Sequence, residues 1–195
     1  MEHPLNEIAA LRQQVYDYFH GNAGVEQYFF DPAHEDEYVA YYNSMYLLQD
    51  STENLIQHRE RGFSADPLAA YLEFWGAMQA AIIQQDAIAE LHRAIFGHSL
   101  DAKAKNRVCW LQVRNLRDVC AGHPAKKSIP KSKPLTRSFM GRSFGNYDGI
   151  EYEQWQQGVG RSHARVPLGS LLDAYSLEAA AELAAILAHL KSRWP

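Results

Sequence analysis

The chain has 195 residues, 47% of them hydrophobic, and a formal net charge of −4. This length can bury a core of its own, and the sequence holds no apolar run of about eighteen residues, which excludes a membrane-spanning helix. The N-terminal segment is acidic and amphipathic, unlike a signal peptide. We therefore expect one domain over residues 1–195, in the cytoplasm and without membrane contact.

Three long helices are predicted in the first half of the chain. Apolar residues at three- and four-residue steps predict the first over 5–19 and the second over 37–62. Asp66 as N-cap and Pro67 in the first turn begin a third helix, which ends at Gly97. The positions expected to face the core are Leu5, Ile8, Leu11, Val15 and Phe19 in the first helix, Val39, Tyr42, Met45, Tyr46 and Leu48 in the second, and Leu68, Leu72, Trp75, Met78, Ile82, Leu91 and Ile95 in the third.

Two further helices are predicted on either side of a basic segment, over 102–121 and 170–194. Residues 123–147 between them hold six Lys/Arg, three Pro and no acidic residue, so a helix is disfavoured there. Asp148-Gly149 between aromatic-rich runs indicates a two-residue hairpin turn. We therefore predict an all-α fold, a bundle of about five helices, with a basic loop and a short β-hairpin inserted at 123–160 before the last helix.

The charge differs between the two halves of the chain. Residues 1–100 carry 15 Asp/Glu and 4 Lys/Arg, whereas residues 101–195 carry 8 Asp/Glu and 15 Lys/Arg. Because phosphate groups bind to local cationic patches, a near-neutral average does not exclude a nucleic-acid ligand. Such a patch is expected in the second half.

The sequence lacks the familiar catalytic signatures. It has no Gly-rich phosphate loop, no His-Glu-x-x-His, no Gly-x-Ser-x-Gly and no Cys-x-x-Cys. His92 and His98 are poorly spaced for metal ligands, and Cys109 and Cys120 lie about 16 Å apart on one predicted helix, too far for a disulfide. We expect neither a metal nor a cofactor.

Two features of the first half have both a structural and a functional interpretation. Asp86 falls on or near the apolar face of the third helix, where a carboxylate requires a partner. It is interpreted as a structural hydrogen-bonding group or as a group that orients a catalytic pair from behind. The tyrosine-rich stretch 38–48 is interpreted as half-buried packing rather than as a base-stacking platform.

The stretch RNLRDVCAGHPAKK, residues 114–127, is the candidate site. Arg117 lies in the last turns of the fourth helix, and Gly122, a predicted C-cap, lets the chain turn His123 back onto the same face. Such an Arg can neutralise charge that builds on a phosphorane, and the His can move a proton to or from a ribose 2′-hydroxyl or the leaving oxygen. The basic residues expected to hold flanking phosphates are Lys126, Lys127, Lys131, Lys133, Arg137 and Arg142.

The same stretch resembles the signature of the HEPN superfamily, in which an Arg and a polar residue are followed, after three to five further residues, by a His. Here the pattern is read as Arg117, Asp118, four further residues and His123. The resemblance implies a helical bundle that forms a homodimer, with both motifs in one cleft. It also implies a metal-independent endoribonuclease that leaves a 2′,3′-cyclic phosphate. By position, Arg117 would stabilise the phosphate charge, His123 would be the general acid or base, and Asp118 would orient one of them.

Members of this superfamily often act in toxin or phage-defence systems, which implies RNA as the substrate and an antitoxin or regulatory protein as a partner. Many members are catalytically silent. A second hypothesis is therefore a non-catalytic helical dimer that binds a partner protein or a nucleotide through the basic segment. A third hypothesis is a small-molecule enzyme that uses the region of Asp86.

Overall fold

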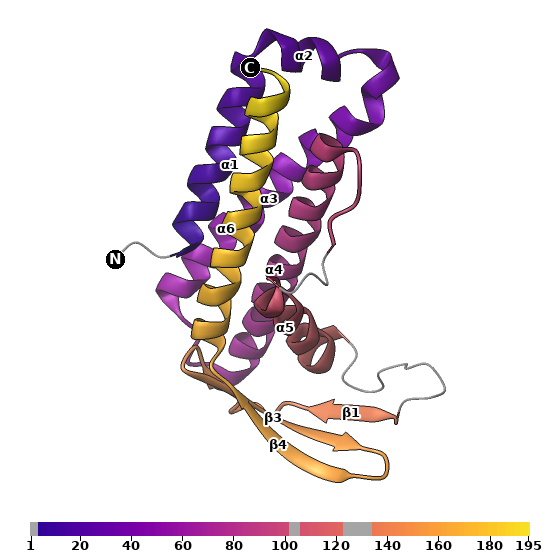
Figure 1. Cartoon of the computed structure of the whole chain (residues 1–195). Helices are drawn as coiled ribbons and strands as arrows, with labels where there is room; N and C mark the ends of the chain where they lie inside the picture. The colour runs from indigo at the N-terminus through magenta and orange to yellow at the C-terminus, as the bar shows by residue number, and fades with distance from the viewer. Residues whose placement is uncertain (1–3, 102–105, 123–133) are drawn as a thin grey trace.

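A computed structural model describes residues 4–101, 106–122 and 134–195. Four long helices form its body: α1 (Pro4–Gly21), α3 (Glu35–Arg61), α4 (Pro67–Phe96) and α6 (Leu168–Arg193). Helix α1 packs mainly on α6, and α3 packs on α4 (Figure 1). The short helix α2 (Ala23–Phe29) and the 3₁₀ turn η1 (Pro32–His34) cross one end of the bundle.

Local signals set the ends of α4. The Asp66 carboxylate accepts a hydrogen bond from the Ala69 amide at 3.0 Å, and Pro67 occupies the first turn. Gly97 follows the helix with φ +76°, a left-handed conformation that residues other than glycine rarely adopt. These caps confirm the third predicted helix and both of its predicted ends.

Helix α5 (Val108–Arg117) lies across the bundle near its lower end in Figure 1. Its N-terminus is capped from another helix, because the Glu178 carboxylate of α6 accepts hydrogen bonds from the amides of Cys109 (2.9 Å) and Trp110 (2.7 Å). A carboxylate at this position is also stabilised by the positive end of the helix dipole. The winding continues past Arg117 as one π-helical turn, η2 (Asp118–Gly122).

A four-stranded antiparallel sheet lies below α5 in Figure 1. Its central strand is β3 (Gly149–Gln156), which pairs with β4 (Gly160–Val166) on one edge. On the other edge β3 pairs successively with β2 (Gly145–Asn146) and β1 (Thr136–Phe139). The sheet therefore packs one face on the helical body and leaves the other outward.

The predicted fold is confirmed in part. A mostly helical chain is confirmed, and the predicted hairpin is present as β2 and β3. The all-α class is wrong, because the described residues hold six α-helices and a four-stranded sheet to which this hairpin belongs. The β2–β3 turn is Tyr147-Asp148, one residue earlier than predicted, since Asn146 pairs with Gly149. The fourth predicted helix, 102–121, is α5 and η2, over 108–122, and 102–105 lie outside the described residues.

The apolar stripe predicted for α3 and α4 is partly wrong. Met45, Leu48, Met78, Ile82, Leu91 and Ile95 are buried as predicted. Val39, Tyr42, Tyr46, Leu68, Leu72 and Trp75 lie on the surface instead. The core positions that replace them on α4 include Gln84 and Gln85, both fully buried. The Gln84 amide is satisfied there, because it donates to Thr52 of α3 and accepts from Tyr175 of α6. Gln85 donates to the Trp110 carbonyl, and its buried Oε1 atom has no hydrogen-bond partner among the described residues.

Candidate functional site

Arg117 and Asp118 lie where α5 passes into the π-turn η2. The Arg117 Nη1 atom lies 3.2 Å from the Asp118 carboxylate, and both side chains are about one quarter to one third exposed. The Arg117 Nε atom is buried and has no hydrogen-bond partner among residues 4–101, 106–122 and 134–195. Single π-turns inside helices are frequent at functional sites. The arrangement leaves a partly exposed guanidinium with unused hydrogen-bonding capacity.

Gly122 lies against the Arg117 side chain. A Cβ atom at position 122 would lie 2.8 Å from Arg117 Nη1, the mobile end of that side chain, so the guanidinium would have to shift. The helical winding ends at Gly122, where the sequence predicts a C-cap. Gly122 is not among the glycines with positive φ, so this end lacks the left-handed conformation that many such caps adopt.

The strand β1 packs on the π-turn. The Ser138 hydroxyl of β1 donates a hydrogen bond to the Val119 carbonyl in η2. This contact places the strand that carries Arg137 directly beside the turn that carries Arg117 and Asp118. Two parts of the candidate site, the motif helix and one edge of the sheet, are thus brought together by the fold.

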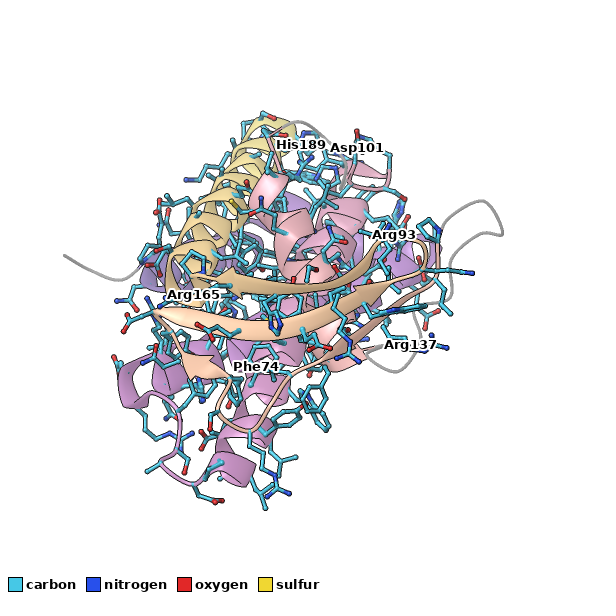
Figure 2. The ribbon with its side chains drawn as sticks, turned by 90° about the horizontal axis from the view of Figure 1, so that it is seen from below. Phe74, Arg93, Asp101, Arg137, Arg165 and His189 are labelled. Carbon is cyan, nitrogen blue, oxygen red and sulfur yellow. The ribbon has the colours of Figure 1, made fainter. Side chains whose placement is uncertain are left out.

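The outward face of the sheet, called the sheet face below, is cationic and aromatic. Strand alternation places on it Arg137, Phe139, Glu151, Glu153, Trp155, Arg161, His163 and Arg165. Arg137 and Arg161 lie opposite Trp155 on its two sides, and the Arg137 guanidinium lies 5.2 Å from the Trp155 ring centre. Figure 2 views this face and shows Arg165 and Arg137 toward its opposite ends. Exposed arginines that flank an aromatic ring can hold phosphates around a stacked base.

Asp86 does not join Arg117. Its side chain is 60% exposed and forms an ion pair with Arg114, one turn before Arg117 on α5. The expectation that Asp86 lies on the apolar face is therefore wrong, although its interpretation as a structural partner agrees with the ion pair. Arg142 is exposed in the segment between β1 and β2.

The remaining predicted site residues lie outside the described residues: His123, Lys126, Lys127, Lys131 and Lys133. The position of His123 relative to Arg117 stays a prediction.

The two cysteines near the motif are poor nucleophiles, because burial raises the pKa of Cys120 to about 12 and also raises the pKa of Cys109.

A pocket of about 460 Å³ lies between α5, β4 and α6. Asn115 and Val119 line it from the motif helix and its π-turn, and Tyr152 and Arg165 line it from the sheet. Side-chain amides and a hydroxyl are groups that fix the orientation of a polar ligand in an otherwise apolar pocket.

A second polar cluster joins the sheet to the helices and has no signal in the sequence. His58 Nδ1 of α3 lies 2.5 Å from the Tyr147 hydroxyl of the β2–β3 turn, and His58 Nε2 lies 3.7 Å from Glu73 of α4. Burial lowers the pKa of His58, and burial raises the pKa of Tyr147 to about 12. Glu73 accepts a hydrogen bond from the Ser64 amide, the main cause of its lowered pKa, and pairs with Arg61. We call the cluster of His58, Tyr147, Glu73 and Arg61 the His58 joint.

Within 4–101, 106–122 and 134–195, no group of three His, Cys, Asp or Glu side chains is placed to hold a metal ion. None of the helices in these ranges is both long enough and apolar enough to cross a membrane. Comparison with protein-family models, curated proteins and solved structures finds no match.

Proposed function

We propose that this protein is a metal-independent endoribonuclease of the HEPN type, which acts as a homodimer in a toxin or phage-defence system. The observation that carries the proposal is the packing of β1 on the π-turn η2. It joins a partly exposed Arg117 to a strand whose outer face carries Arg137. A phosphate-stabilising group and a phosphate-binding surface therefore belong to one continuous part of the molecule.

The chemistry follows from the residue types. The guanidinium of Arg117 stabilises the charge that develops on the phosphate, and His123 moves a proton to or from the ribose 2′-hydroxyl or the leaving oxygen. Asp118, 3.2 Å from Arg117, orients the guanidinium. The row Arg137, Trp155 and Arg161 holds the strand through two phosphates and one stacked base. Arg142 and the lysines at 126, 127, 131 and 133 supply further cations for flanking phosphates.

The test is cleavage of single-stranded RNA in EDTA, with analysis of the product ends. We expect wild type to leave 2′,3′-cyclic phosphates, and both Arg117→Ala and His123→Ala to lower the rate by about 100-fold or more. Arg114→Ala is the matched control, because Arg114 lies one turn earlier on α5 and pairs with Asp86. Equal cleavage rates for Arg117→Ala and Arg114→Ala would show that the motif takes no part in the reaction.

A second candidate is a non-catalytic module that binds a nucleotide, and the pocket of about 460 Å³ favours it. Gln112 and Asn115 line this pocket from α5 and supply two side-chain amides for a base. Wild type that cleaves no RNA but binds a mononucleotide, with affinity lost in Asn115→Ala and kept in Arg117→Ala, would support this function over the nuclease.

A further inference from the structure

The outer side of α3 and α4 holds an open apolar groove of about 730 Å³. Its floor is made of small residues of α4, Gly76, Ala77 and Ala80, and Leu47 and Ile83 lie along its sides. Beside it on α4, Leu72 and Trp75 are 66% and 39% exposed, and on α3 Leu47 is 45% exposed. Within the described residues no other element covers this apolar surface, and one end of the groove is lined by His58, Arg61 and Glu73 of the His58 joint.

The length of the groove fits a helix better than a compact ligand. Its lining residues run from position 47 to 61 on α3 and from 73 to 83 on α4, which is about 15–21 Å of helix axis. A helix satisfies its own backbone hydrogen bonds, whereas an extended segment between two helices would find no partner for them. Small residues at positions 76, 77 and 80 allow a third helix to approach closely.

The charge around the groove indicates the chemistry of that helix. The charged side chains that line the groove include Asp50, Glu73 and Arg61, of which Glu73 and Arg61 pair with each other, and over their whole lengths α3 and α4 carry nine Asp/Glu and three Lys/Arg. Asp50 lines the groove, Glu53 and Glu60 lie on the exposed side of α3, and none of these three carboxylates forms an ion pair within the described residues. A second copy docked through the same face would place acidic side chains against acidic side chains, which is unfavourable. A basic partner would not pay this cost.

We propose that the α3–α4 groove binds a basic amphipathic helix of a partner protein. The apolar side of that helix packs on Gly76, Ala80 and Leu72, and its Lys or Arg residues pair with Asp50 and the carboxylates beside it. The proposal is independent of the nuclease function, because it uses neither α5 nor the sheet. It gives the chain two separate binding surfaces, one for a polyanion and one for a polycation.

The test is fluorescence anisotropy with a labelled 18-residue helical peptide made of Leu and Lys in an amphipathic pattern. We expect binding by wild type, and none or much weaker binding of two control peptides. One has the same composition scrambled to remove the apolar face, and the other has Glu in place of Lys. Equal binding of either control peptide would overturn the proposal.

Variants of the full chain test whether the peptide binds in the α3–α4 groove. Gly76→Leu places a side chain in the groove at a position where a Cβ meets nothing within 4 Å, and we expect it to weaken binding about tenfold or more. Leu72→Ala and Asp50→Asn should each weaken binding, about three- to tenfold. Leu177→Ala is the matched control, because Leu177 is a 56% exposed leucine on α6.

Two outcomes would contradict the proposal. Unchanged affinity in Gly76→Leu and Leu72→Ala would show that the peptide binds elsewhere. Light scattering after size-exclusion chromatography could show that wild type is a dimer and Gly76→Leu a monomer. A second copy, and not a basic partner, would then occupy the groove.

Discussion

The sheet face and the α3–α4 groove both expose large apolar and aromatic side chains, but their charges are opposite. On the sheet face, three arginines at 137, 161 and 165 outnumber two glutamates at 151 and 153. On the two helices that form the groove, α3 and α4, acidic residues outnumber basic ones by nine to three over their whole lengths. Exposed aromatic residues alone do not identify a ligand, since they can stack on a base or pack on a helix. The sign of the surrounding charge separates the two cases.

The two regions also differ in backbone. On the sheet face, every second residue of each strand points outward, and a cation lies directly opposite an aromatic ring on the neighbouring strand. In the groove, the lining residues recur every three or four positions along two helices, which gives an apolar strip with carboxylates at its side. We expect four measurements to sharpen this comparison.

Charge reversal should give the largest effect. Arg137→Glu combined with Arg161→Glu should lower the affinity for a single-stranded RNA oligonucleotide at low salt by about 100-fold, and should lower the slope of log affinity against log salt by about 2. Arg93→Glu is the matched control, because Arg93 is on α4 and pairs with Asp36 and Glu90. If Arg93→Glu weakens RNA binding as much, the two surfaces do not differ in the proposed way.

Removing one buried hydroxyl should test whether both regions share one cooperative core. Tyr175 of α6 donates to Gln84 of α4 at 2.8 Å, and Gln84 donates to Thr52 of α3 at 2.7 Å. Tyr175→Phe leaves the buried Gln84 oxygen without a donor, so we expect the free energy of unfolding to fall by about 1–3 kcal/mol.

Urea unfolding measures the Tyr175→Phe loss, and amide exchange of β3 and α3 measures where it acts. Tyr42→Phe is the control, since Tyr42 is exposed and its hydroxyl lies 3.5 Å from that of Tyr46. We expect Tyr42→Phe to change the unfolding free energy by less than about 0.5 kcal/mol. If Tyr175→Phe lowers the amide-exchange protection of α3 but not that of β3, the sheet is stabilised separately from the helices.

The ends of the long helices could be predicted from the sequence because they depend on neighbouring residues. Asp66 and Pro67 begin α4 and Gly97 ends it through contacts within one turn. The side that faces the core was predicted less well. The periodicity of Leu68, Leu72 and Trp75 shows an apolar stripe, but it does not show which neighbour, if any, covers that stripe.

The sheet and the polar clusters were missed for a different reason. The strands are short and polar on their outer face, so their sequences differ little from those of loops, and only one turn was recognised. His58 and Tyr147 are 89 residues apart, and Glu178 caps α5 from 68 residues away. The first pair exists only after the sheet has packed on α3, and the second only after α6 has returned to the bundle. Arg117 and Asp118, in contrast, are adjacent and form a recognisable motif.

Loss of a helix cap should have a smaller effect and should act on the groove side alone. Asp66→Ala removes the acceptor of the Ala69 amide, and we expect the free energy of unfolding to fall by about 1 kcal/mol. Leu68 and Leu72 lie in the turns that this cap begins, so binding of the Leu/Lys peptide should weaken while RNA binding stays unchanged. Asp31→Ala is the control, because Asp31 caps only the three-residue turn η1 and should cost less.

The His58 joint connects the two regions, and we expect it to give the smallest effect, a dependence of stability on pH. Burial is the main cause that lowers the pKa of His58, and Arg61 lowers it further, whereas Glu73 raises it. Tyr147 bonds the other ring nitrogen. Because the unfolded chain binds a proton near pH 6.5 and the folded chain binds it only at lower pH, the unfolded state holds more protons in that interval.

Stability should therefore be complete above about pH 6.5 and fall as the pH decreases toward the lowered pKa of His58. His58→Asn keeps a polar atom near the Tyr147 hydroxyl but does not titrate, so its thermal midpoint should change less than that of wild type between pH 7.5 and pH 5.5. His163→Asn, on the outward face of β4, is the control. A wild-type midpoint that falls no faster than that of His58→Asn would show that protonation of His58 does not link the sheet to the α3–α4 pair, and that the contact of Tyr147 with the helices depends on packing alone.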